Sequence, residues 1–165
     1  MNDLSHWIWL TRIENVSKKL LFDLLQKYKT PKNMWNLTKE ELINSGITKK
    51  NAQNITNTKY KQNLSKYVDY MQKTRVELIS IKDEHYPKSL KNIYDPPIAL
   101  YIKGDKEILN SFGIAIIGAR KASLYGETVA KQFACDLANS NINIVSGGAR
   151  GIDTSAHLRC FTSKI

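Results

Sequence analysis

The chain has 165 residues, of which 42% are hydrophobic and 24% charged, a composition typical of a folded globular protein with one ordinary core or two small ones. This length excludes a large multidomain enzyme. Lys and Arg number 25 against 15 Asp and Glu, so the formal net charge is +10, which favours an anionic partner such as nucleic acid. A merely solvated lysine-rich surface fits the same charge, so charge alone does not decide between these readings.

The two cysteines, Cys135 and Cys160, lie far apart and lack the spacing of a disulfide framework or a zinc site. We therefore expect a reducing compartment and no metal. Residues 1–15 include an early acid and no long apolar segment, unlike a secretory signal peptide. No segment of the chain reaches the about 20 apolar residues that a membrane span needs. The sequence thus predicts a cytoplasmic protein without membrane contact.

Residues 1–70 have helical periodicity and predict a small all-helical domain. The buried stripe of its clearest helix consists of Leu20, Leu21, Leu24 and Leu25. Thr38 and Glu41 have the spacing of a capping box, which starts a helix that we expect to stop at Gly46. Thr48 is the expected N-cap of the helix that follows.

From about residue 71 the pattern changes to short apolar runs, and we assign 71–165 to a second domain. Within it, residues 76–110 predict a connector with an edge strand. The strand-like runs are "VELISI" and "IALYIKG". Between them lie Pro87, Pro96 and Pro97, which predict an extended connector rather than a helix.

Residues 111–165 predict a strand, a helix and a second strand. "GIAIIG" and "INIVSGG" are continuous apolar runs, typical of parallel strands covered on both faces. The helix between them places Val129, Phe133 and Leu137 on one expected buried face. Such a βαβ unit has a right-handed crossover, so the fold class is α/β, with a helical domain followed by the first half of a doubly wound sheet.

Each predicted strand runs into a loop of small residues that leads into a helix. Ligands of open α/β sheets bind at the carboxyl ends of the strands, where loop N–H groups and helix N-termini favour anions. Arg120, Lys121 and Arg150 lie in these two loops and supply charge-assisted donors for phosphate oxygens. The sequence therefore predicts a ligand that carries phosphates.

A nicotinamide cofactor is not expected at these loops. No glycine stands between Gly118 and Gly126, and the second strand ends in Ser146 rather than in an acid, so the dinucleotide fingerprint is absent. Asp153 and His157 share one helix face, which would suit a metal or acid–base pair. We favour a capping role for Asp153, because a metal site needs more ligands than these two.

Three segments in order, "DEHYPKSLKNIYDPPIALYIKG", "IAIIGARKASLYG" and "VSGGARGIDTSAH", resemble the signature segments of the DNA-processing protein A family (DprA/Smf) over about residues 80–157. The resemblance implies a non-enzymatic, cofactor-free bacterial protein that binds and protects single-stranded DNA in natural transformation and helps to load the RecA recombinase. It also implies an extended Rossmann-like domain that dimerises, and an N-terminal domain of sterile-alpha-motif (SAM) or helix-hairpin-helix type.

The resemblance also assigns site residues. Gly118, Ala119 and Arg120 match the family's Gly-Ser-Arg phosphate-contact motif, with alanine in place of the serine donor. The second glycine loop of the family is matched as well. The expected DNA-binding and phosphate-binding residues are Gly118, Ala119, Arg120, Lys121, Ser123, Gly147, Gly148, Arg150 and Gly151. Tyr125 either stacks on a base or covers the core.

The helical domain departs from the helix-hairpin-helix pattern. Where that motif has Gly-Val-Gly, the first copy here has Asn15, Val16 and Ser17, whereas the second copy keeps Gly46. Glycines in these turns let backbone N–H groups approach phosphates. Their loss favours a structural or protein-contacting role over DNA contact.

The chain reads "LRCFTSKI" after His157 and ends, whereas the family continues with Gly-Ala-Leu and further strands. We expect a frameshift just after His157, with a deliberate cut as the alternative. Either way, the partial sheet should leave an open edge, an uncovered apolar face and an incomplete dimer surface. A Rossmann-like nucleotide-binding or nucleotide-hydrolysing enzyme and a pure interaction module remain alternative functions.

Overall fold

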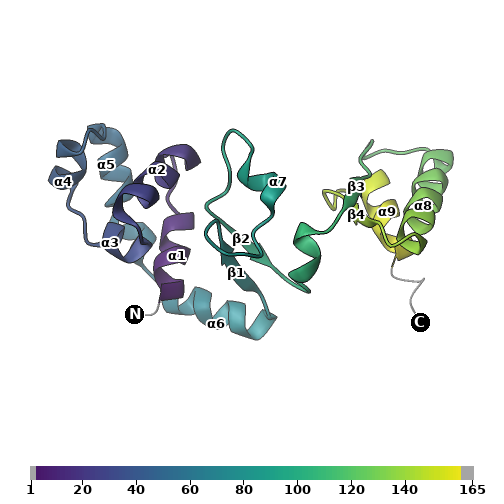
Figure 1. Cartoon of the computed structure of the whole chain (residues 1–165), viewed down its shortest axis with the longest axis horizontal. Helices are drawn as coiled ribbons and strands as arrows, with labels where there is room; N and C mark the ends of the chain where they lie inside the picture. The colour runs from purple at the N-terminus through teal and green to yellow at the C-terminus, as the bar shows by residue number, and fades with distance from the viewer. Residues whose placement is uncertain (1–2, 161–165) are drawn as a thin grey trace. The chain divides into compact units, whose positions relative to one another are not determined.

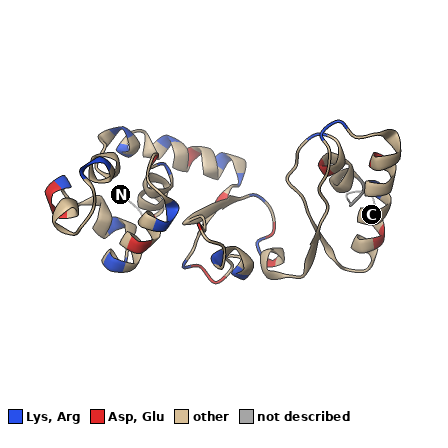
Figure 2. Ribbon diagram, turned by 90° about the horizontal axis from the view of Figure 1, so that it is seen from above, with Lys and Arg blue, Asp and Glu red and all other residues tan. Residues whose placement is uncertain are grey.

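The computed structural model describes residues 3–160, which form two compact units that divide after Asn110. We call residues 3–110 the first unit and residues 111–160 the second unit. Lys and Arg are spread over the helices of the first unit and are few in the second (Figure 2). Within the described residues, no helix has the length and apolar character needed to cross a bilayer.

Helices make up the first part of the first unit (Figure 1). They are α1 (Asp3–Thr11), α2 (Lys18–Tyr28), α3 (Pro31–Trp35), α4 (Lys39–Asn44), α5 (Lys49–Ile55), the 3₁₀ helix η1 (Thr58–Lys61) and α6 (Leu64–Thr74). The leucine stripe of α2 is confirmed, because Leu21, Leu24 and Leu25 are buried and Leu20 packs against the same core. This core also includes Trp9 and Met34.

The predicted helix caps are confirmed. The Thr38 hydroxyl accepts from Glu41 N at 3.2 Å, and the Glu41 carboxylate accepts from Thr38 N at 2.7 Å, which completes the capping box of α4. Thr48 accepts from Asn51 N at 3.3 Å at the start of α5. The residue after the last turn of α4, Gly46, has φ of +94°. These local bonds explain why short helices stop and start where they do.

The turns before α2 and α5 share two features despite their different residues, a positive φ and a capping hydroxyl two residues later. Asn15 has φ of +58° and Gly46 has φ of +94°; two residues later Ser17 caps α2 and Thr48 caps α5. Asparagine is one of the few non-glycine residues that adopts positive φ without large strain. Asn15 therefore adopts a positive φ at the position where the helix-hairpin-helix pattern would have a glycine.

Two strands complete the core of the first unit. β1 (Glu77–Ser80) and β2 (Ala99–Ile102) pair antiparallel and form a two-stranded sheet of their own. Ile81, Tyr86 and Ile98 belong to the same buried cluster as the helices. The expected edge strand of a Rossmann-like sheet is thus, in the structure, part of a small sheet that packs with the helical core.

The expectation of an extended connector between these strands is wrong at one place. A single turn of helix, α7 (Lys88–Lys91), begins directly after Pro87, because proline is tolerated at a helix start and only prevents a helix from continuing through it. Tyr86 is fully buried, and its hydroxyl donates to Pro97 O at 2.6 Å, which ties the two ends of the connector together. The 3₁₀ helix η2 (Glu107–Asn110) ends the unit.

The second unit is a βαβ arrangement followed by a helix, as predicted. Its elements are β3 (Gly113–Ala115), α8 (Leu124–Asn139), β4 (Asn143–Val145) and α9 (Ile152–Cys160). The strands are parallel, with Gly113 opposite Asn143 and Ala115 opposite Val145. The chain is therefore a mixed α/β protein, while its assignment to SAM, helix-hairpin-helix and Rossmann-like domains stays a prediction.

The packing of the second unit differs from the predicted one. Phe133 was expected on the buried face of α8 but is 61% exposed, and the buried residues of that helix are Ala130 and Ala134. Helices α8 and α9 pack against each other, and alanines let their backbones approach closely. The face that the helix buries is therefore set by its smallest side chains rather than by its largest.

The strands of the second unit are not covered on both faces. Ala115 and Val145 are partners in the sheet and are both exposed, and Ile117, two residues beyond Ala115, is 76% exposed. The expected uncovered apolar face is confirmed. The frameshift expectation concerns the residues after His157, of which 161–165 lie outside the described part of the chain.

Candidate nucleic-acid interface

Both strands of the second unit end at the same edge of the sheet. Ile116 N donates to Val145 O at 3.0 Å, one step beyond the last paired residues. The Ser146 hydroxyl then donates to Ile116 O at 2.8 Å, so the side chain that follows β4 continues the ladder. The two loops predicted to bind phosphate therefore leave the sheet side by side.

The two loops touch at a glycine. Gly151 has φ of +80°, and a Cβ placed on it would lie 2.3 Å from Ala119 O and 2.8 Å from Arg120 O. Next to this contact, Ile152 N donates to Ala119 O at 3.3 Å. No side chain fits at position 151, so glycine is required there by both backbone conformation and space.

A second contact between the loops is made by a side chain that the sequence did not single out. Ile152, the first residue of α9, lies over Gly118, where a Cβ would come within 2.7 Å of its Cγ1. It also reaches Gly126 in the first turn of α8. Position 118 therefore needs a glycine, because Ile152 packs against it. The two residues are far apart in the sequence, so the sequence alone does not reveal this contact.

Side chains at the start of each helix bind the backbone near that start. Ser123 accepts from Gly126 N at 3.1 Å and is the N-cap of α8. Asp153, which is buried, accepts from Ala149 N at 3.3 Å, while Thr154 Oγ1 donates to Ala149 O at 2.7 Å. Asp153 thus has a structural role, but the backbone donor that it binds belongs to the second loop and not to the first turn of α9, where a cap was predicted.

The remaining predicted residues face solvent. Arg120, Lys121 and Arg150 are exposed, and their side chains have no hydrogen bond or ion pair with the described residues. Gly147 and Gly148 are also exposed, and Gly148 has φ of +70° with open space around it. The structure thus brings Ala119 and Arg120 against Gly151 and Gly118 against Ile152, whereas no hydrogen bond or ion pair joins the side chain of Lys121 or Arg150 to a described residue of the opposite loop.

Tyr125 lies at the start of α8 and is 79% exposed. This exposure rules out the core role that was one of its two predicted readings. Its ring is accessible for stacking.

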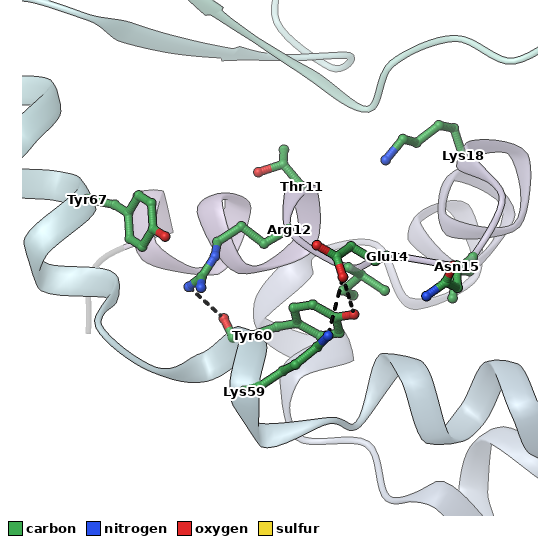
Figure 3. A pocket seen from close by; sticks show the side chains of 10 residues that line it. Thr11, Arg12, Glu14, Asn15, Lys18, Lys59, Tyr60 and Tyr67 are labelled. Atoms are coloured by element: carbon green, nitrogen blue, oxygen red, sulfur yellow. Dashed lines mark hydrogen bonds and ion pairs between the residues drawn. The ribbon is translucent and has the colours of Figure 1, made fainter.

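The first unit contains a concave site that sequence reasoning missed (Figure 3). The pocket has a volume of about 710 Å³. It is lined by Thr11, Arg12, Ile13, Glu14, Asn15, Val16, Lys18, Lys59, Tyr60 and Tyr67. These residues come from the end of α1, the turn that follows it, the start of α2, η1 and α6, so no local motif joins them in the sequence.

Comparison with known proteins identifies relatives of this chain. It is 34% identical to Protein Smf of Escherichia coli (strain K12) over 116 residues, which cover 70% of this chain and 31% of that protein. It is 40% identical to the DNA processing protein DprA of Streptococcus pneumoniae (strain ATCC BAA-255 / R6) over 79 residues, 48% of this chain and 28% of that protein. The matched regions thus span about a third or less of these relatives.

A solved structure and a family model extend this likeness. The X-ray structure of DNA processing protein A from Streptococcus pneumoniae matches with a TM-score of 0.70 and 25% identity, over 98% of this chain and 55% of that one. The model of the family described as DNA recombination-mediator protein A matches residues 77–165, which include both strand-end loops and more than half of the chain. The chain therefore belongs to the DNA recombination-mediator protein A family.

Proposed function

We propose that the chain binds single-stranded DNA through the two loops of the second unit, as part of DNA processing and recombination. Membership of the family supports a role in recombination, and the geometry of the loops supports contact with a phosphate backbone. The matched regions span about a third or less of the curated relatives. That this chain has the activity of a whole family member is therefore proposed and not shown by the match.

The observation that carries the proposal is the contact between the loops. The bond from Ile152 N to Ala119 O joins the start of α9 to the loop that leads into α8, at the edge where both strands end. Arg120 and Arg150 stand next to these helix starts without partners among the described residues. Cations and helix N-termini at one edge attract successive phosphates of a strand without reading its sequence.

We propose a binding role rather than a catalytic one. The acid nearest to the second loop, Asp153, is buried and accepts from Ala149 N, so it is engaged in structure. Within residues 3–160, no three His, Cys, Asp or Glu side chains are grouped so that they could hold a metal ion. Transfer of the bound DNA to a RecA-type recombinase, dimerisation and a cytoplasmic location complete the proposal, and these rest on the family alone.

A fluorescence-anisotropy titration of the full chain with a labelled single-stranded oligonucleotide tests the proposal. We expect Arg120→Ala to weaken binding by about tenfold, since hydrogen bonds to charged groups contribute about 1.5–3 kcal/mol. The matched control is Lys131→Ala, a cation in the middle of α8 and away from both loops, which should leave affinity within about twofold.

Salt dependence provides a second readout of the same contact. The slope of log K against log salt should fall in magnitude by about 0.7 in Arg120→Ala, because one phosphate contact of a single strand is lost. Binding that is insensitive both to Arg120→Ala and to salt contradicts the proposed mechanism.

A further inference from the structure

The pocket of the first unit is large enough for a nucleotide. Its volume of about 710 Å³ lies within the range of small-ligand sites in proteins, about 300–1,000 Å³. Figure 3 shows Arg12 between Tyr67, which comes from α6, and Glu14, which comes from the turn after α1. Charged and aromatic side chains from separate elements therefore meet in one concavity.

Arg12 is held in a fixed orientation with donors to spare. Its Nη1 donates to Tyr60 O at 3.2 Å and to Gln62 O at 2.9 Å, and its Cζ lies 4.4 Å from the centre of the Tyr67 ring. Guanidinium has five N–H donors, and no described residue accepts from Nε or Nη2. The side chain is thus preorganised beside an aromatic ring, with three N–H groups available to a ligand.

The acid in the pocket is satisfied on one oxygen only. Glu14 Oε2 accepts from Lys59 Nζ at 3.3 Å and from the Tyr60 hydroxyl at 3.3 Å. The hydrogen bond from Lys59 is the main reason that the pKa of the Glu14 carboxyl lies below its ordinary value, so this group is ionised at neutral pH. Glu14 Oε1 has no hydrogen-bond partner among the described residues.

A further cation lies on the side of the pocket away from the aromatic ring. In Figure 3, Lys18 and Tyr67 lie on opposite sides of Arg12 and Glu14. Lys18 is half-buried at the first position of α2, and its side chain has no hydrogen bond or ion pair with a described residue. The pocket therefore has an aromatic end, a cationic end and one open acceptor between them.

We propose that this pocket binds one nucleotide of a single-stranded nucleic acid. The base stacks on the part of the Tyr67 ring that Arg12 leaves uncovered, since this residue is 44% exposed. Arg12 donates to the base or to its phosphate, and Lys18 binds the phosphate. Glu14 Oε1 accepts from an exocyclic amino group of the base. An acidic peptide fits less well, because its carboxylates would be repelled by Glu14 and would make no use of the stacking surface.

This contact goes beyond the proposed function, because the two loops lie in the second unit and the pocket lies wholly in the first. It does not depend on the hairpin glycines, whose loss argues against backbone contact with DNA in this part of the chain. It also differs from the loop site in chemistry, since it engages a base as well as a phosphate.

Photo-crosslinking of the full chain to an oligodeoxycytidylate that carries 5-iodocytosine tests the inference, with crosslinked residues located by mass spectrometry. We expect a crosslink to Tyr67 and a loss of affinity of at least about fivefold in Tyr67→Leu, the lower bound for stacking of one base. The matched control is Tyr70→Leu, which lies on the same helix, is 64% exposed and does not line the pocket.

Two further variants guard against a misfolded protein. Lys18→Gln should weaken binding, and Lys27→Gln, an exposed cation on the same helix, should not. Circular dichroism should show the native helix content for all four variants. Crosslinks confined to residues 111–165, or equal effects of Tyr67→Leu and Tyr70→Leu, overturn the inference.

The two DNA contacts are separated in an Arg120→Ala background. The crosslink to Tyr67 should persist when crosslinks to the loops weaken, and an equal loss of both would show that the pocket does not bind by itself. Polyglutamate that competes as well as the oligonucleotide at equal ionic strength also overturns the inference, because it would show that the pocket responds to charge alone.

Discussion

The two units of this protein are held together in different ways. The first unit buries large side chains completely, among them Trp9, Leu21 and Leu25. In the second unit the buried apolar side chains, among residues 111–158, are Ala130, Ala134 and Ala156. A fully buried leucine contributes about 1.5–3 kcal/mol and an alanine much less, so the second unit depends more on backbone hydrogen bonds and close helix contact.

This difference has a consequence for function. The proposed DNA-binding loops stand on the less well packed unit, where Ile117 and Phe133 remain exposed. A ligand that binds only the folded state stabilises it by RT ln(1 + L/Kd), where L is the free ligand concentration. Because the second unit has less packing of its own, DNA bound at its loops should raise its stability by a larger fraction than DNA bound at the pocket raises that of the first unit. Hydrogen exchange with and without an oligonucleotide can measure this for each unit.

The largest expected effect tests the core of the first unit. Leu21→Ala should lower its free energy of unfolding by about 2–5 kcal/mol, because the side chain is fully buried and the substitution leaves a cavity. All three tryptophans, Trp7, Trp9 and Trp35, lie in this unit, so urea unfolding followed by tryptophan fluorescence reports on it alone. Leu124→Ala, an exposed position in the second unit, should leave that transition unchanged, and an equal shift in both variants contradicts the comparison.

Features that depend on residues close together in the sequence were predicted, whereas features that depend on distant residues were not. The capping box of Thr38 and Glu41 and the cap at Thr48 depend on residues three positions apart, and all were predicted. The buried face of α8 was not, because periodicity favoured Phe133 and the neighbouring helix selected alanines instead. The contact of the loops at Gly151 was not predicted: this glycine was expected to bind phosphate, but its contact with Ala119 was not foreseen.

The pocket of the first unit was missed for the same reason. Arg12 donates to the carbonyls of Tyr60 and Gln62, about 50 residues away in the sequence, and Tyr67 joins them from another helix. Contacts of this range leave no pattern in a single sequence. The domain boundary expected near residue 70 likewise followed a change in local pattern, whereas the compact units divide after Asn110 because Ile81, Tyr86 and Ile98 pack with the helices.

A smaller effect tests the loops of the second unit. Gly151→Ala combines a positive φ with a collision against Ala119 O, whereas Gly148→Ala meets the positive φ alone. Backbone strain of this kind costs about 1–3 kcal/mol, so Gly148→Ala should weaken DNA binding moderately and Gly151→Ala more. Oligonucleotide titration and limited proteolysis of each variant measure the two effects, and the reverse order would show that the loops do not touch as described.

A still smaller effect concerns base preference at the pocket of the first unit. Oligodeoxycytidylate should bind up to about fivefold more tightly than oligodeoxythymidylate, because only cytosine offers an amino group to Glu14 Oε1. Glu14→Gln, measured with Lys59→Gln as a control for the lost ion pair, should remove most of this preference. Equal affinity for the two oligonucleotides in the original chain would remove Glu14 from the contact.

The smallest effect is a pH dependence that tests whether the first unit extends to Asn110. His85 Nδ1 lies 3.0 Å from Asp83 Oδ1 and His85 Nε2 lies 3.0 Å from Glu107 Oε1, so the imidazole joins the loop after β1 to η2. The hydrogen bond with Asp83 is the main cause that raises the pKa of His85, helped by the charge of Glu107 and opposed by Lys106 and by burial. Glu84 is also near, at 4.0 Å.

Because the pKa of His85 is raised in the folded protein, its charged form is the stabilising one. The stabilisation should be complete below the ordinary imidazole value of about 6.5 and should be lost as the pH rises through the raised pKa. An NMR titration, with the His85 ring protons assigned by their absence in His85→Gln, should give a midpoint above that of an unfolded histidine. Glu107→Gln should lower this midpoint, and a midpoint that it leaves unchanged would show that η2 is not held against the first unit by this contact.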